Sequence, residues 1–404
     1  MRIGKVLPLI TLDDFSICCL STTDRALLTK GAIMNQRYED HLTRTLKAVH
    51  MEKVDKIPFS WNGPAYLPHR QGLKMSEAVA DYERSVTAAV DFCNAHPEID
   101  SLHSPCFCPY VLPTLWLAEV KVPGKDLPDD ELWQMHEKQC MTEEDYQIII
   151  DEGYGPWMAR YMEERIGDPM NRPETKKYMA YAPTAVQRMR DEAGIPIMNS
   201  TIGATPIENF CGARGMVDFF VDTVEEPELL KKAMDAAWEV LLKNYLDGLN
   251  PNCFGAWCGG WRAAPQLMSH DTWMEFVWPY LEEMILKTIE AGVTPVLHFD
   301  SCWDNELETL KTLPARKCVL MLDGFTDVRK AREVLDDRMC LLGDVPASML
   351  AFGTASEVYD YCMKLFKDVG PTGLMLSSGC DCPLNAKDEN VDAMLQSTLD
   401  YRVG

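Results

Sequence analysis

The 404-residue chain has no apolar run that could cross a bilayer, and it is poor in positive charge. A membrane-spanning helix needs ~18 consecutive apolar residues. Lysine and arginine number 39 against 62 aspartates and glutamates, so the formal net charge is -23. Such a charge repels phosphate backbones and anionic lipid headgroups, which disfavours binding to nucleic acid or to a membrane. We therefore expect a small-molecule ligand or a protein partner.

Signals for secretion, for nucleotide binding and for a domain boundary are also missing. Fifteen cysteines are an odd number, their spacing does not form a disulfide framework, and no secretory signal precedes them. We expect reduced thiols and a cytoplasmic location. Neither G-x-G-x-x-G nor a P-loop motif occurs. Because no linker rich in glycine, serine or proline divides the chain, we expect one large domain.

Residues 1–33 match nothing in the pattern that follows them. They are either an N-terminal arm or a leader that results from an upstream start codon, and we expect no function there. From residue 34 to 404 the chain reads as one domain. Within it, the charged tract at residues 126–144 is most simply a solvated helix and loop.

After residue 37, amphipathic helices alternate with short apolar runs, which is typical of βα units and a parallel sheet. The runs expected to form strands are residues 57–61, 101–103, 195–199, 253–257, 295–299, 318–322, 339–343 and 373–377. Eight strands predict an α/β fold, a (β/α)8 TIM barrel with an N-terminal elaboration. An open doubly wound sheet is the alternative, but no nucleotide-binding motif supports it.

Metal-binding side chains stand where two of these strands end. His298 and Asp300 share one face at the end of a strand, and Cys380 follows a later strand. Because the carboxyl ends of barrel strands open into one mouth, the three side chains could bind one zinc ion and leave its fourth position open. Cys302 and Cys382 lie close enough in sequence to replace one of these ligands.

Other residues near strand ends are candidates for supporting roles. Asp323 and Asp344 also end strands; they would act in catalysis by hydrogen bonding to His298 or to substrate, or else simply cap the helices that follow. The tryptophans preferred as substrate-binding walls are Trp257, Trp261 and Trp303, because each comes just after a strand. Such walls suit an aromatic substrate.

These residues resemble the uroporphyrinogen decarboxylase superfamily, and in particular its corrinoid-dependent methyltransferase branch. The similarity covers roughly residue 34 to the C-terminus. It rests on residues 43–58, on Arg214-Gly215, on His298-Phe-Asp300, on Gly343-Asp344-Val345 and on Ser378-Gly379-Cys380.

The resemblance implies a zinc site with one altered ligand. The methyltransferase branch carries a His-x-Cys pair and a distant cysteine; His298 and Cys380 match two of these positions, and Asp300 stands in place of the middle cysteine. A harder ligand set leaves more positive charge on the metal. This favours Lewis-acid action on an ether or alcohol oxygen over activation of a thiol.

The function expected from this resemblance is zinc-dependent transfer of a methyl group between a small methylated compound and a corrinoid. A methoxylated aromatic is the preferred substrate, although thiol methylation in the other direction stays open. No D-x-H-x-x-G motif of corrinoid binders occurs in the chain. The corrinoid would therefore be carried by a partner protein. A homo-oligomer is compatible with the sequence.

Two alternatives belong to other functional classes. One is a uroporphyrinogen decarboxylase-like enzyme acting on a carboxylated tetrapyrrole. Against it, the stretch at residues 58–70, which is arginine-rich in that enzyme, has Arg70 as its only arginine, and residues 103–108 carry no aspartate. The other is a barrel without activity that binds a corrinoid protein.

Overall fold

Eight parallel strands form one curled sheet in the computed structural model, which describes residues 22–403. The strands are β1 (Phe59–Trp61), β2 (Ile99–Leu102), β5 (Asn199–Gly203), β6 (Gly255–Gly260), β7 (Thr294–Phe299), β8 (Val319–Leu322), β9 (Cys340–Val345) and β10 (Leu374–Ser378). Their order is β2-β1-β10-β9-β8-β7-β6-β5. A parallel bridge between Leu102 and Ile197 brings the two ends of the sheet together. The predicted (β/α)8 barrel is confirmed.

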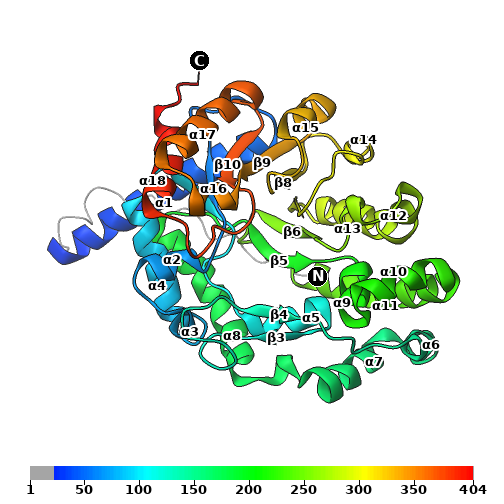
Figure 1. Ribbon diagram of the computed structural model, residues 1–404. Coiled ribbons are helices and arrows are strands. Elements are labelled where there is room, and N and C mark those ends of the chain that lie inside the picture. Colours follow the sequence, from blue (N-terminus) through cyan, green and yellow to red (C-terminus); the bar gives the residue numbers. More distant parts are fainter. Residues whose placement is uncertain (1–21, 404) are drawn as a thin grey trace, which may run out of the picture.

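Helices surround the strands, as Figure 1 shows. The longer ones are α1 (Thr22–Val49), α4 (Tyr82–Ala95), α8 (Pro173–Arg188), α11 (Pro227–Asp247), α13 (Trp278–Glu290), α17 (Ala355–Val369) and α18 (Asp388–Asp400). Apart from the more exposed β5, the strands are largely buried on both faces, because helices cover the outside and side chains fill the inside. This explains their nearly continuous apolar sequences, such as Val319–Leu322.

The barrel interior is packed in layers. Parallel pairing aligns His298 with Met321, Met321 with Leu342, and Leu342 with Met375. Met321, Leu342 and Met375 are fully buried in one apolar cluster together with Val296, which lies two residues before His298 on the same face of β7. The interior is therefore filled below His298, and polar chemistry is confined to the mouth.

Helix α1 begins earlier than the sequence pattern indicates. We expected a helical start near residue 34, whereas α1 already begins at Thr22 and runs to Val49. The predicted boundary between residues 33 and 34 lies inside this helix. The domain division itself stays a prediction, and residues 1–21 lie outside the described part of the chain.

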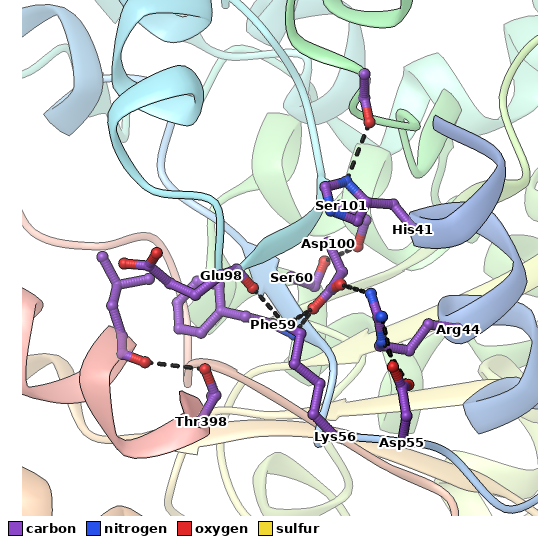
Figure 2. A network of polar contacts seen from close by, with 12 residues as sticks. His41, Arg44, Asp55, Lys56, Phe59, Ser60, Glu98, Asp100, Ser101 and Thr398 are labelled. Atoms are coloured by element: carbon purple, nitrogen blue, oxygen red, sulfur yellow. Dashed lines mark hydrogen bonds and ion pairs between the residues drawn. The ribbon is translucent and has the colours of Figure 1, made fainter. Parts of the chain in front are cut away.

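A buried carboxylate joins α1 to the amino ends of the first two strands (Figure 2). Asp100 of β2 is completely buried and accepts hydrogen bonds from Arg44 Nη1 (2.6 Å), Lys56 Nζ (2.5 Å) and the backbone N–H of Phe59 (2.8 Å). Arg44 also pairs with Asp55 at 2.7 Å. This face lies opposite the mouth, where barrel residues usually serve stability.

Two local expectations were wrong. The charged tract contains strand β4 (Gln134–His136), which forms an antiparallel hairpin with β3 (Glu119–Lys121). The third barrel strand is β5 at Asn199–Gly203, later than the expected residues 195–199, because the earlier segment joins β2 only through a single bridge. Among residues 22–403, no helix is both long and apolar enough to cross a membrane.

Candidate metal centre

Three potential metal ligands meet at the carboxyl ends of β7 and β10. His298 Nε2 lies 3.4 Å from Asp300 Oδ1 and 3.7 Å from Cys380 Sγ. One ligand atom from each of the three residues lies within 4.8 Å of the other two. The structure therefore brings together the three residues that the sequence selected. Cys302 and Cys382 are not part of this cluster.

The two distances from His298 suit a tetrahedral zinc ion. Ligand atoms at about 2.0–2.3 Å from zinc in a tetrahedron lie about 3.3–3.8 Å from one another. The distances from His298 Nε2 to the other two ligand atoms fall in this range. His298 is buried, whereas the Asp300 side chain is 33% exposed, so one side of the cluster stays accessible. Such access is what a fourth, open position requires.

The charges of His298 and Asp300 stabilise each other. Burial opposes a charge on His298, but its hydrogen bonds to Asp300 and Cys380 outweigh burial and raise its pKa well above the usual value. Burial also opposes ionisation of Asp300, yet the contact with His298 lowers the pKa of that carboxyl group. Burial raises the pKa of the Cys380 thiol. A bound cation would replace the positive charge of His298.

The two aspartates expected to assist catalysis make other contacts. Asp323 accepts hydrogen bonds from the backbone N–H groups of Ser301 (2.7 Å) and Phe325 (2.9 Å), which ties together the loops after β7 and β8. Asp344 accepts a hydrogen bond from the Tyr361 hydroxyl at 2.9 Å, and burial raises its pKa to about 6. Neither aspartate lines the cavity described below, and their catalytic role stays a prediction.

The three selected tryptophans occupy different positions. Trp257 lines the cavity and packs against the His298 ring, with 5.8 Å between ring centroids. Trp261 also lines the cavity. Trp303 is fully buried, does not line it, and donates a hydrogen bond from Nε1 to the Asp300 carbonyl oxygen at 3.1 Å. Trp303 thus supports the loop that carries Asp300.

A cavity of about 260 Å³ opens beside the three ligands. His298, Asp300 and Cys380 form part of its wall. Its aromatic lining consists of Phe107, Trp116, Trp133, Trp257 and Trp261. Trp133 comes from the segment just before β4, so the unexpected hairpin supplies one wall of the cavity.

Polar residues that the sequence analysis missed also line this cavity. They are Glu208 on α9 (Pro206–Arg214), His103 after β2 and Asn199 at the start of β5. Each is buried or half-buried, and each has a buried polar atom with no hydrogen-bond partner within residues 22–403: Glu208 Oε2, His103 Nε2 and Asn199 Oδ1. Burial lowers the pKa of His103 to about 3, so its ring is neutral.

The signal that could have found Glu208 is its place after a strand. Thr205-Pro206 begins the helix that follows β5. Because this strand was expected at residues 195–199, the sequence analysis did not place Glu208 at the mouth. Burial raises the Glu208 pKa to about 7, despite the nearby Arg262.

Known proteins resemble this chain in sequence and in fold. Residues 146–401 match the family model for uroporphyrinogen decarboxylase (URO-D). The chain is 32% identical over 113 residues to a uroporphyrinogen decarboxylase of Chlorobium phaeovibrioides, a match that covers 27% of this chain and 30% of that protein. It is 26% identical over 145 residues to one of Chlorobaculum tepidum, covering 35% and 38%. The matches thus span well under half the length of these curated relatives.

A solved structure shares the fold over most of both chains. It is a methyltransferase from Methanosarcina mazei, with a TM-score of 0.66 and 18% sequence identity. The similarity covers 89% of this chain and 98% of that one. At this identity the likeness supports the architecture alone. The family model covers more than half of the residues, and this chain therefore belongs to the uroporphyrinogen decarboxylase family.

Proposed function

We propose that this protein is a zinc-dependent methyltransferase. It moves a methyl group between a small methylated compound, preferably a methoxylated aromatic, and a corrinoid carried by a partner protein. The observation that supports this most is the convergence of His298, Asp300 and Cys380 on one point beside a cavity. The fold shared with a methyltransferase is compatible with it.

The ligand set suits work on an oxygen atom. His298, Asp300 and Cys380 would hold the zinc, which acts as a Lewis acid when bound. One imidazole, one carboxylate and one thiolate leave more positive charge on the metal than a set with two thiolates. An oxygen leaving group of a methyl ether benefits from that charge.

The cavity suits a flat, apolar ring. Indole rings of Trp133, Trp257 and Trp261 form much of its wall. Its volume of about 260 Å³ is slightly below the range of about 300–1,000 Å³ that is typical of ligand pockets. A substrate with one aromatic ring matches this size and lining better than a macrocycle does.

The partner would dock at the mouth of the barrel. Phe325 is 75% exposed in the loop after β8, at the same end of the barrel as the cavity. Asp323, two residues before it, holds this loop against Ser301. An exposed aromatic side chain on a loop that is fixed by hydrogen bonds is typical of an interface with another protein.

Methyl transfer from 1,2-dimethoxybenzene and related ethers to cob(I)alamin tests the proposal. The zinc-loaded protein should form methylcobalamin, and treatment with a chelator should abolish the reaction until zinc is restored. Metal analysis should find one zinc per chain in the wild type and less in the Cys380→Ser variant. Full activity in a protein without zinc would reject the proposal.

Decarboxylation of a tetrapyrrole is the second candidate, because the curated relatives carry that name. The cavity opposes it, since none of its described lining residues is a lysine or an arginine. Arg70, the arginine of the stretch after the first strand, pairs with Asp392 at 2.9 Å. Spectroscopic titration with a porphyrinogen distinguishes the candidates, because tight binding would favour the decarboxylase.

A further inference from the structure

Glu208 lines the cavity that contains the metal ligands, and one of its carboxyl oxygens has no hydrogen bond. Its side chain is completely buried. Oε1 accepts a hydrogen bond from the Ala263 backbone N–H at 3.0 Å, whereas Oε2 has no hydrogen-bond partner within residues 22–403. Glu208 and the three ligand residues line the same cavity. Oε2 is therefore the atom of this side chain that has hydrogen-bonding capacity left for a ligand.

Arg262 does not satisfy this oxygen. The Arg262 Nη1 atom lies 3.6 Å from Glu208 Oε2, which is beyond hydrogen-bond distance. Arg262 Nη2 donates to Glu137 at 3.0 Å and the guanidinium group lies 4.3 Å from the Trp261 ring centroid, whereas Nε and Nη1 have no hydrogen-bond partner within residues 22–403, so Nη1 forms only an ion pair with Glu208. Arg262 is thus close enough to favour the ionised form of Glu208, but it donates no hydrogen bond to Oε2.

Burial makes the neutral form of Glu208 accessible near neutral pH. A buried carboxylate whose oxygen lacks a hydrogen bond is costly, and protonation removes that cost. Burial raises the pKa of this carboxyl group to about 7, although Arg262 opposes the shift. A neutral carboxyl group can donate one hydrogen bond from its free oxygen, and an ionised one cannot.

We propose that Glu208 contacts the substrate and is its proton donor. The O–H group at Oε2 donates a hydrogen bond to the oxygen of a bound methyl ether and transfers its proton when that oxygen leaves. The transfer step rests on the proposed function, whereas the hydrogen bond depends only on the cavity. An ether oxygen has two lone pairs, and Glu208 needs one of them.

The step balances in atoms and electrons. The bond between the methyl carbon and the ether oxygen breaks, and its electron pair stays on oxygen. The cobalt(I) of the corrinoid supplies the pair for the new cobalt–carbon bond and becomes formally cobalt(III). The proton of Glu208 adds to the oxygen, so an alcohol or phenol leaves. Water then returns a proton to the carboxylate.

Ether binding measured against pH tests the hydrogen bond. The probe is 1,2-dimethoxybenzene, which only accepts hydrogen bonds, titrated by calorimetry into the zinc-loaded protein. From about pH 6 to about pH 8.5 the wild-type Kd should rise about tenfold or more, because the ionised carboxyl group cannot donate. In the Glu208→Gln variant the amide still donates, so the Kd should change less than about twofold.

Two further variants make the result specific. Glu306→Gln changes a buried glutamate that bonds His270 and lies outside the cavity lining, and it should keep the wild-type pH dependence. Glu208→Asp keeps a carboxyl group beside Arg262, but the shorter side chain withdraws the acid group and should weaken binding at pH 6. A pH-independent wild-type Kd, an unchanged pH dependence in Glu208→Gln, or no ether binding at pH 6 would each overturn the proposal.

Measurement of kcat distinguishes a failure of the Glu208 proposal from a failure of the methyltransferase proposal. Loss of a proton donor should lower kcat for methyl transfer about 100-fold in Glu208→Gln, with KM nearly unchanged. An unchanged kcat in that variant rejects proton donation and leaves the methyltransferase assignment standing. A wild type that binds ethers with the expected pH dependence but transfers no methyl group rejects the methyltransferase instead.

Discussion

His298 Nε2 lies 3.7 Å from Cys380 Sγ, although 82 positions separate the two residues in the chain. The contact exists because β7 and β10 are parallel strands of one barrel whose carboxyl ends share a mouth. Asp300 completes the cluster from the end of β7. This relationship is the basis of the first two predictions.

Cys380→Ser should lose most of its zinc. A neutral hydroxyl group is a much poorer zinc ligand than a thiolate, and changing even an outer partner of a metal ligand costs about 10–100-fold in affinity. We expect a loss at least as large, measured by competition with a chromophoric chelator. The control is Cys302→Ser, outside the cluster, which should bind zinc as the wild type does. Equal zinc affinity in both variants would contradict the ligand assignment.

Asp300→Cys should shift the substrate preference while keeping zinc. A second thiolate reduces the positive charge on the metal, so ether cleavage should slow by about tenfold or more, and methylation of a thiol from methylcobalamin should accelerate. Both rates are measured on the same preparation, together with its zinc content. If the ratio of the two rates does not change, Asp300 does not set the choice between oxygen and sulfur.

Phe325→Asp should impair docking of the partner and leave the chemistry intact. The side chain is 75% exposed at the mouth, so its replacement should not unfold the barrel. We expect methyl transfer to protein-bound corrinoid to fall by about tenfold, as for a contact worth about 1–2 kcal/mol, and transfer to free cob(I)alamin to stay unchanged. A parallel loss with both acceptors would argue against a docking role.

Asp100→Asn should destabilise the barrel without affecting zinc binding. The change leaves the side chains of Arg44 and Lys56 without their buried carboxylate, and breaking a buried pair typically costs about 3–5 kcal/mol. Urea unfolding followed by circular dichroism measures the difference. Asp55→Asn is the matched control: that side chain is 68% exposed, so its pair with Arg44 should contribute less than about 1 kcal/mol.

The sequence pattern was sufficient to predict the barrel and to select three potential metal ligands that the structure brings together. Apolar strands alternating with amphipathic helices predict βα units, because each element must bury one face against the next. His298, Asp300 and Cys380 could be selected because they are the metal-binding side chains at predicted strand ends. The zinc itself, the corrinoid partner and the substrate remain proposals.

Helix and strand limits were less predictable. Helix α1 extends back to Thr22, and β5 begins at Asn199, four residues after the expected start of that strand. The β5 limits depend on pairing with β6, a contact between segments far apart in sequence. The pairing cannot be predicted from the composition of the β5 segment alone.

By itself, the sequence determined which potential metal ligands stand at the strand ends, because local periodicity places a strand and its final residues together. Only the tertiary structure decided what surrounds them. The cavity brings Glu208 of α9 and Trp133 beside β4 to the same wall as His298, and it leaves Trp303, Asp323 and Asp344 outside. Closure of the barrel decides those neighbours, since it depends on contacts between distant segments.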